Sequence, residues 1–194
     1  MRIERIRRKI WKFTDWPGLS SNVYLLDLDV PTLIDLGNAE FHGILVRGLS
    51  KLGYKTIDIK RIIFTHLHYD HVGKPDAFKN AEFFASEEEV EDIRQGRLTR
   101  FLARFGKKQP TLEDIDIKPV KDFNDLFVVR TPGHTRGSIC LWLRSKRILF
   151  SGDTLFNNNI IGRTDLPYSA PGSMQDSLKK LQRFKYKVLC PGHG

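Results

Sequence analysis

Three histidines and one aspartate fall within six residues, directly after an apolar run, and this cluster restricts the chain more than any other feature. Residues 62–71 read Ile-Ile-Phe-Thr-His-Leu-His-Tyr-Asp-His. Alternate side chains of an extended strand face the same way, so we expect His66, His68 and Asp70 to share one side. If the chain then turns, His71 can join them. Neutral imidazoles and carboxylates suit zinc, iron or manganese, so the spacing predicts a metal site rather than isolated polar residues.

Three later turns each present one more residue of ligand type directly after an apolar stretch. They are Thr131-Pro132-Gly133-His134, Ser151-Gly152-Asp153 and Pro191-Gly192-His193. Turns that follow rigid strands commonly display functional side chains. Five histidines and two aspartates exceed what one tetrahedral zinc needs and suit two metals that share a bridge. A carboxylate can reach two cations with its two oxygens, and Asp153 is the best candidate. The sixth histidine, His42, is expected to be a surface or packing residue.

The remaining pattern predicts strands and helices in a mixed order. Expected strands cover 2–13, 22–28, 31–36, 58–65, 82–85, 125–130, 138–143, 147–150 and 187–190. Asn38 is expected to cap a helix, Ser86 and Glu89 to form a capping box for the next one, and Ser173 to cap the last. A short helix over 98–105 with a basic face is expected to pack on a sheet, or to serve as a lid or an anion-guiding rim. We predict two sheets covered by helices in a single domain over residues 1–194.

The composition narrows the partners and the compartment. The formal net charge is +9, which fits an anionic partner, but basic residues are spread among acidic ones, so we expect a charge-rich surface and no specific nucleic acid. No apolar run is long enough to span a bilayer, which predicts a cytoplasmic protein with no membrane contact. Cys140 and Cys190 lack the spacing of paired ligands and are expected to be buried free thiols without a catalytic role. The oligomeric state is not constrained.

In its motifs and their order, the chain resembles the metallo-β-lactamase superfamily. The motifs are Asp35 after a strand, His66-x-His68-x-Asp70-His71, Gly133-His134-Thr135, Gly152-Asp153-Thr154 and the terminal Gly192-His193. This resemblance covers nearly all of the sequence. It implies an α/β (α+β) fold, a four-layered αββα sandwich of two mixed β-sheets flanked by helices, with a metal site at one edge of the sheets.

The resemblance also implies a role for each residue of these motifs. It assigns three histidines to a first metal, a second set to a second metal, and Asp153 to both. Asp35 would accept a hydrogen bond from a ligand imidazole and orient it. The implied first set is His66, His68 and His134, and the implied second set is Asp70, His71 and His193.

Within the superfamily, the details are similar to the hydroxyacylglutathione hydrolase (glyoxalase II) branch. True β-lactamases lack a histidine at the place of His71, and flavodiiron proteins have a glutamate at the place of His68. The segment 162–167, Gly-Arg-Thr-Asp-Leu-Pro, looks like one that lines the site in single-domain members and in persulfide dioxygenases. Arg163 would then contact an anionic substrate, or else pair with Asp165 and shape the loop. The family's core usually continues a little past Gly194, so further residues are expected.

The function predicted from this resemblance is metal-dependent hydrolysis of a small anionic thioester such as S-lactoylglutathione. Two divalent ions, expected to be zinc with iron or manganese as alternatives, would hold the attacking hydroxide, and Asp70 or Asp153 would manage the proton. The alternatives are a persulfide dioxygenase with a single iron on His66, His134 and the aspartate, or a lactonase or nuclease. A non-enzymatic binding protein fits least, because such relatives generally lose metal ligands and this chain has every residue of the family's ligand set.

Overall fold

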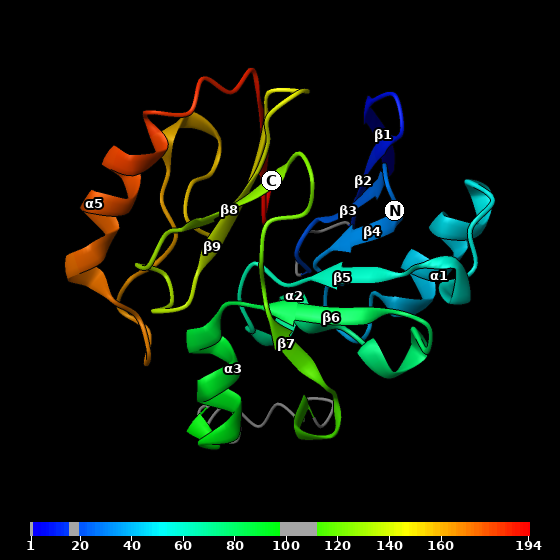
Figure 1. Cartoon of the computed structure of the whole chain (residues 1–194), viewed down its shortest axis with the longest axis horizontal. Coiled ribbons are helices and arrows are strands. Elements are labelled where there is room, and N and C mark those ends of the chain that lie inside the picture. Colours follow the sequence, from blue (N-terminus) through cyan, green and yellow to red (C-terminus); the bar gives the residue numbers. More distant parts are fainter. Residues whose placement is uncertain (1, 16–19, 98–111) are drawn as a thin grey trace.

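The computed structural model describes residues 2–15, 20–97 and 112–194, and their strands form two sheets (Figure 1). In the larger sheet the strands follow the chain order, the first four pair antiparallel, and the last four pair parallel. It is therefore mixed. Its members are β1 (Arg2–Arg7), β2 (Ile10–Thr14), β3 (Val23–Asp27), β4 (Pro31–Ile34), β5 (Arg61–Ile63), β6 (Glu82–Ala85) and β7 (Ile117–Pro119).

The smaller sheet is also mixed. Its order is β11-β10-β9-β8, with β10 and β11 parallel and the other neighbours antiparallel. Strands β8, β10 and β11 therefore run in the same direction and end at the same edge. The bounds are β8 (Leu126–Arg130), β9 (Ile139–Leu143), β10 (Ile148–Gly152) and β11 (Val188–Pro191).

Helices cover the outer faces of both sheets. Figure 1 shows α5 outside the smaller sheet and α1 on the far side of the molecule. The helices are α1 (His42–Lys51), α2 (Tyr69–Val72), α3 (Glu87–Arg94) and α5 (Pro171–Leu181), with short 3₁₀ turns η1 (Thr56–Asp58), η2 (Pro75–Ala77), η3 (Leu112–Asp114) and η4 (Asn157–Asn159).

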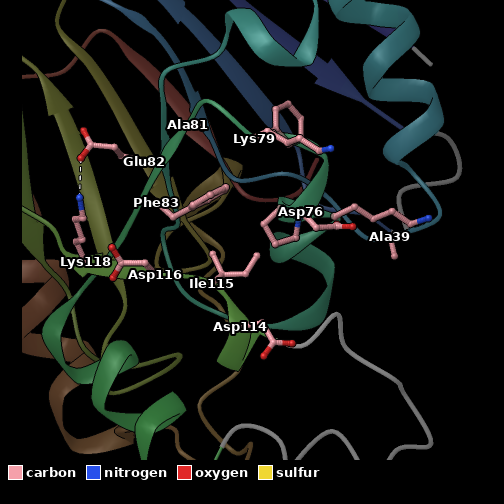
Figure 2. Close-up of a pocket in the computed structure, with 13 residues that line it drawn as sticks. Ala39, Asp76, Lys79, Ala81, Glu82, Phe83, Asp114, Ile115, Asp116 and Lys118 are labelled. Carbon is pink, nitrogen blue, oxygen red and sulfur yellow. Dashed lines mark hydrogen bonds and ion pairs between the residues drawn. The ribbon is translucent and has the colours of Figure 1, made fainter.

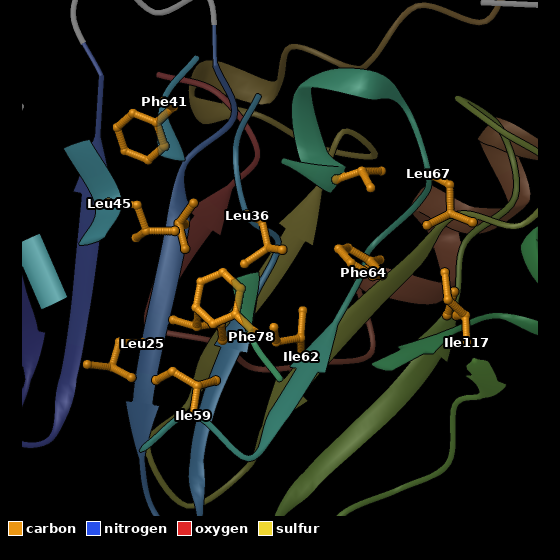
Figure 3. Packing of buried hydrophobic residues seen from close by; sticks show 14 of the residues in the cluster. Leu25, Leu36, Phe41, Leu45, Ile59, Ile62, Phe64, Leu67, Phe78 and Ile117 are labelled. Atoms are coloured by element: carbon orange, nitrogen blue, oxygen red, sulfur yellow. The ribbon is translucent and has the colours of Figure 1, made fainter. Parts of the chain in front are cut away.

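The apolar residues of the central strands alternate between two buried layers. Leu25 faces the layer beneath α1, which Figure 3 shows, whereas Leu26 faces the other sheet. On the smaller sheet, Leu141 joins the layer between the sheets and Trp142 packs beneath α5 beside Leu181. Because successive strand residues point to opposite faces, each sheet is buried on both sides. The predicted αββα sandwich is confirmed; the extent of the single domain, 1–194, stays a prediction.

Several element boundaries differ from the sequence prediction. Residues 2–13 form a hairpin instead of one strand, with Lys9 in a left-handed conformation (φ 64°) at the turn. Helix α5 begins at Pro171, so Ser173 lies inside its first turn and does not cap it. Asn38 accepts the backbone N–H of Phe41 just before α1. The helix expected over 98–105 lies outside the described residues.

Two further expectations concern burial. Cys140 and Cys190 are buried free thiols, as predicted, and burial raises their pKa values to about 11 and about 12. Thiols in this state are poor nucleophiles at neutral pH.

Among the residues described, no helix is both long and apolar enough to cross a membrane.

Candidate metal centre

The first group of candidate ligands consists of His66, His68 and His134. His66 and His68 follow β5, and His134 lies in the turn after β8. The Nδ1 atom of His68 lies 3.1 Å from Nε2 of His66 and 2.9 Å from Nε2 of His134. Two ligands of a tetrahedral zinc, each about 2.0–2.1 Å from the ion, lie about 3.3 Å apart. The three imidazole nitrogens therefore converge with nearly the spacing that one metal ion requires.

The second group consists of Asp70, His71 and His193. Helix α2 begins at Tyr69, so the chain leaves its extended path before it reaches Asp70 and His71. Asp70 Oδ2 lies 3.2 Å from Nε2 of His193, and the ligand atoms of the whole group lie within 4.8 Å of one another. These three residues are the set that the family resemblance implies for a second metal, and that assignment stays a prediction.

Asp153 lies between the two groups. Its Oδ1 is 3.3 Å from Nε2 of His71, and its Oδ2 is 3.5 Å from Nε2 of His193 and 3.6 Å from Nε2 of His134. Within the described part of the chain, the buried atoms Asp153 Oδ1 and His71 Nε2 face each other as an ion pair but form no hydrogen bond. Buried polar atoms without a hydrogen bond are uncommon, and a cation between these two would satisfy both. The donor set therefore fits two divalent ions with Asp153 reaching both.

The edge of the fold explains why these distant residues meet. Strands β5, β8, β10 and β11 each deliver a ligand-bearing loop after their last residue. Two backbone bonds hold these loops together: the N–H of Ser21 donates to the carbonyl of Asp70 within the larger sheet, and the N–H of Asn22 donates to the carbonyl of Gly192 across the two sheets. A glycine is needed at position 192, because a Cβ there would collide with Asp153 Oδ1 and come within 2.9 Å of the His71 ring.

Burial keeps the first group neutral. Desolvation, together with the neighbouring imidazoles, lowers the pKa of His66 well below its ordinary value and that of His68 to about 3. Burial also lowers the pKa of His134. Because only neutral imidazole binds a metal, these three side chains need lose no proton at neutral pH.

Carboxylates have the opposite effect on the second group. Burial acts to lower the pKa of His71, but Asp153 and Asp35 outweigh it and raise that pKa well above the ordinary value. Burial is likewise outweighed at His193, where hydrogen bonds to Asp153 and Asp70 raise the pKa to about 9. The pKa values of Asp70 and Asp153 are lowered in turn: burial opposes the change, and the histidines overcome it. Without metal, the second group is a network of ion pairs.

Outer hydrogen bonds fix the orientation of two candidate ligands. Asp35 accepts from the backbone N–H and hydroxyl of Thr65, and its Oδ2 lies 2.9 Å from Nδ1 of His71. Nδ1 of His134 lies 2.8 Å from the carbonyl oxygen of Arg163. A partner on one ring nitrogen directs the lone pair of the other toward a metal. Asp35 therefore has the contact expected of an orienting residue.

The carbonyl of Arg163 contacts His134, but its side chain pairs with Asp165. Its guanidinium donates two hydrogen bonds of 2.9 Å to Asp165, and both side chains are 69% exposed. The structure thus shows the pairing that the sequence left as one of two possibilities. His42 lies on α1 with its ring 6.0 Å from that of Phe78, which agrees with the packing role expected for it.

Sequence reasoning missed the part played by Glu89. We expected its side chain to complete a capping box, and the hydroxyl of Ser86 does accept the N–H of Glu89. The Glu89 carboxylate, however, accepts hydrogen bonds from the Leu67 N–H and the Thr135 hydroxyl. Its place in the helix could not reveal this, because the partners come from distant loops.

A pocket of about 830 Å³ lies elsewhere, between η2, β6 and β7 (Figure 2). Its walls mix lysines with carboxylates, including the pair of Lys118 and Glu82 drawn in Figure 2. None of the seven candidate metal ligands lines it. This pocket and the cluster of ligand-type residues are therefore separate features.

Comparison with known proteins identifies the class to which this fold and site belong. A family model described as the metallo-β-lactamase superfamily matches residues 16–193. The chain belongs to this superfamily and is a metal-dependent hydrolase of that fold.

Two similar proteins are named as hydrolases. The chain is 33% identical to the probable metallo-hydrolase MJ0888 of Methanocaldococcus jannaschii, over 91% of this chain and 89% of that protein. It is 30% identical to the human acyl-coenzyme A thioesterase MBLAC2 over 68% of this chain, and it spans only 54% of that protein.

Solved structures repeat the architecture. TTHA1623 in a di-iron-bound form matches with a TM-score of 0.78 and 26% identity, over 94% of this chain and 91% of that one. The BLEG-1 B3 metallo-β-lactamase matches with a TM-score of 0.77 and 25% identity, over 95% and 91% of the two chains. The fold predicted from the sequence is thus shared with structures of this superfamily.

Proposed function

We propose that the protein hydrolyses a small anionic thioester, in the manner of glyoxalase II, with S-lactoylglutathione as the model substrate. The main support is the geometry of two adjoining donor groups joined by Asp153, which suits two metal ions acting on one carbonyl. The similarity to a relative named an acyl-coenzyme A thioesterase also favours the thioester class.

The proposed ligands follow the two groups. His66, His68 and His134 would hold one divalent ion, and Asp70, His71 and His193 the other, with Asp153 between them. We propose zinc for both ions, with iron or manganese as alternatives, because imidazole and carboxylate ligands accept all three. When bound, such ions supply Lewis acidity to a substrate carbonyl and to water.

The carboxylates of Asp70 and Asp153 are proposed to handle the proton. Their lowered pKa values keep them ionised at neutral pH, so each can accept a proton from water that attacks the carbonyl.

Arg163 is proposed to bind the anionic part of the substrate. An ion pair this exposed contributes little net stability, so the guanidinium can exchange Asp165 for a substrate carboxylate or phosphate. Its carbonyl contacts His134, which places the residue beside the first donor group.

A persulfide dioxygenase is the second candidate. It would need a single iron on His66, His134 and Asp153, and Asp153 Oδ2 lies 3.6 Å from Nε2 of His134. The similar structure TTHA1623, in a di-iron-bound form, favours iron as the metal but not a single ion.

Metal content measured by mass spectrometry beside three assays tests the proposal. Purified protein and protein reloaded with zinc, iron or manganese would be given S-lactoylglutathione, an acyl-coenzyme A, and glutathione persulfide with an oxygen electrode. About two metals per chain with thioester turnover is expected. One iron per chain with oxygen uptake and no thioester turnover would favour the dioxygenase, and turnover of neither substrate class would leave a lactonase or nuclease.

A further inference from the structure

A buried carboxylate joins the two loops that supply the first donor group. Glu89, in the first turn of α3, is only 3% exposed. Its Oε2 accepts the backbone N–H of Leu67 at 3.2 Å, and its Oε1 accepts the hydroxyl of Thr135 at 2.5 Å. Leu67 stands between His66 and His68, and Thr135 directly follows His134. One side chain therefore contacts both loops at positions next to all three histidines.

The side chain of Thr135 is itself held in place. Its hydroxyl lies 2.8 Å from the Ser138 hydroxyl, and its backbone N–H donates to the same Ser138 oxygen at 3.0 Å. Gly137 lies against α3 so closely that a Cβ there would come within 2.6 Å of Glu89 Cγ and of Ser86 Oγ. The turn after β8 is thus packed directly on the start of the helix, with no space for a side chain at Gly137.

A second connection lies one turn further along α3. Asp92 is 5% exposed and accepts hydrogen bonds from Nε of Arg136, at 2.9 Å, and from its Nη2. The helix therefore holds the turn of His134 at two points, but only the Glu89 contact also reaches the loop of His66 and His68. This makes Glu89 the link between the loops, and Asp92 a support for one of them.

Burying the Glu89 carboxylate costs hydration free energy, which argues that its contacts are not incidental. Burial raises the pKa of Glu89 to about 7, although the bonds from Thr135 and Leu67 favour its ionised form. A buried polar group must find partners to offset its lost hydration. Capping α3 requires only Ser86, so the helix does not need a buried glutamate at this position.

We propose that Glu89 is a positioning residue for the first metal. By fixing the loops on either side, it holds the three imidazole nitrogens at the separations of 2.9 and 3.1 Å that a single ion can use. This inference rests on the proposed metal centre, and it concerns metal binding rather than the identity of the substrate.

Four variants separate this role from general stability. Glu89→Ala removes both bonds, and Thr135→Val removes one while keeping the shape of the side chain. Glu89→Gln can accept from Leu67 with its oxygen and donate to Thr135 with its nitrogen, because the Thr135 hydroxyl can turn toward Ser138. Glu87→Ala is the matched control, since Glu87 is an exposed glutamate in the same helical turn.

The measurements are the dissociation constant of each metal site by chelator competition, the absorption spectrum with cobalt as the metal, and the melting temperature of the metal-free protein. For Glu89→Ala we expect first-site affinity to fall about 10–100-fold, the effect typical of lost partners around metal ligands, with an altered cobalt spectrum. Thr135→Val should show a smaller loss in the same direction. Glu89→Gln should bind within about threefold of the unmodified protein, and Glu87→Ala should match it.

Two results would overturn the proposal: unchanged first-site affinity and cobalt spectrum in Glu89→Ala with only a lower melting temperature, or equal losses at both metal sites. If Glu89→Ala fails to fold, Thr135→Val with unchanged affinity would overturn it instead. Failure of the proposed function looks different, because the unmodified protein would then bind metal, respond to Glu89→Ala as expected, and still hydrolyse no thioester.

Discussion

The two donor groups of the metal centre meet at Asp153 but are built in opposite ways. His66, His68 and His134 are buried imidazoles whose pKa values are lowered, and they contact one another. His71 and His193 are paired with carboxylates that raise their pKa values. The first group is therefore ready to bind a cation without losing protons. The second is stabilised by its own ion pairs until a cation displaces the protons. In one centre, therefore, burial sets the protonation of the first donor group, and neighbouring carboxylates set that of the second.

The largest expected effect comes from removing the residue that the two groups share. Asp153→Ala should lower metal content and thioester turnover together, with turnover falling at least about 100-fold because metals supply several kcal/mol of transition-state stabilisation. Metal analysis and kinetics on the same preparation would check this. Asp176→Ala, which removes an exposed carboxylate on α5, is the control. Retained activity in Asp153→Ala would remove its assignment as the shared ligand.

A change at Asp35 should affect the second group alone. Asparagine tolerates the left-handed backbone at this position (φ 58°) and can still accept from Thr65, but its amide nitrogen would donate to Nδ1 of His71. The proton of His71 would then lie on Nε2, the atom that faces Asp153. We expect second-site affinity to fall about 10–100-fold in Asp35→Asn, measured by chelator competition. An equal loss at the first site would show that the two groups are not independent.

The two groups should also respond differently to pH. His193, with a pKa of about 9, is protonated at pH 7 in the metal-free protein, so metal binding there must release a proton. Second-site affinity should rise between pH 7 and 9, whereas first-site affinity should change little. The same raised pKa means that the stability contributed by this ion pair is complete below about pH 6.5 and is lost as the pH rises through 9. Metal titrations at several pH values, beside melting curves of the metal-free protein, test both statements. If metal affinity changed equally with pH at the two sites, the proposed difference between the two groups would be contradicted.

The smallest effect is expected at the one histidine outside both groups. His42→Ala should leave metal content and turnover unchanged, because this side chain packs on Phe78 from the surface of α1. Metal analysis beside the thioester assay would show this. A loss of metal would mean that the centre extends beyond the two groups described.

Much of the fold could be predicted from local pattern. Strand β6 occupies the predicted residues 82–85, and the other strands of the central layers differ from their predicted ends by a few residues. These segments are buried on both faces and are rich in β-branched and aromatic residues, so their signal is strong. β7 was missed because only Ile117 of its three residues is buried and it ends in proline. The hairpin turn at Lys9 was missed because lysine, unlike glycine or asparagine, gives no signal of a left-handed turn.

The sequence alone determined which residues form the candidate centre, because ligand chemistry is a property of side-chain type and each ligand follows an apolar strand. Only the tertiary structure decided how these residues meet in space. Helix α2 begins at Tyr69 and takes Asp70 and His71 off the extended path of the chain, and the parallel course of β8, β10 and β11 brings His134, Asp153 and His193 to one edge. The link through Glu89 was likewise invisible in the sequence, since its partners are 22 and 46 residues away. Contacts of this kind depend on how loops pack, and no local pattern records that.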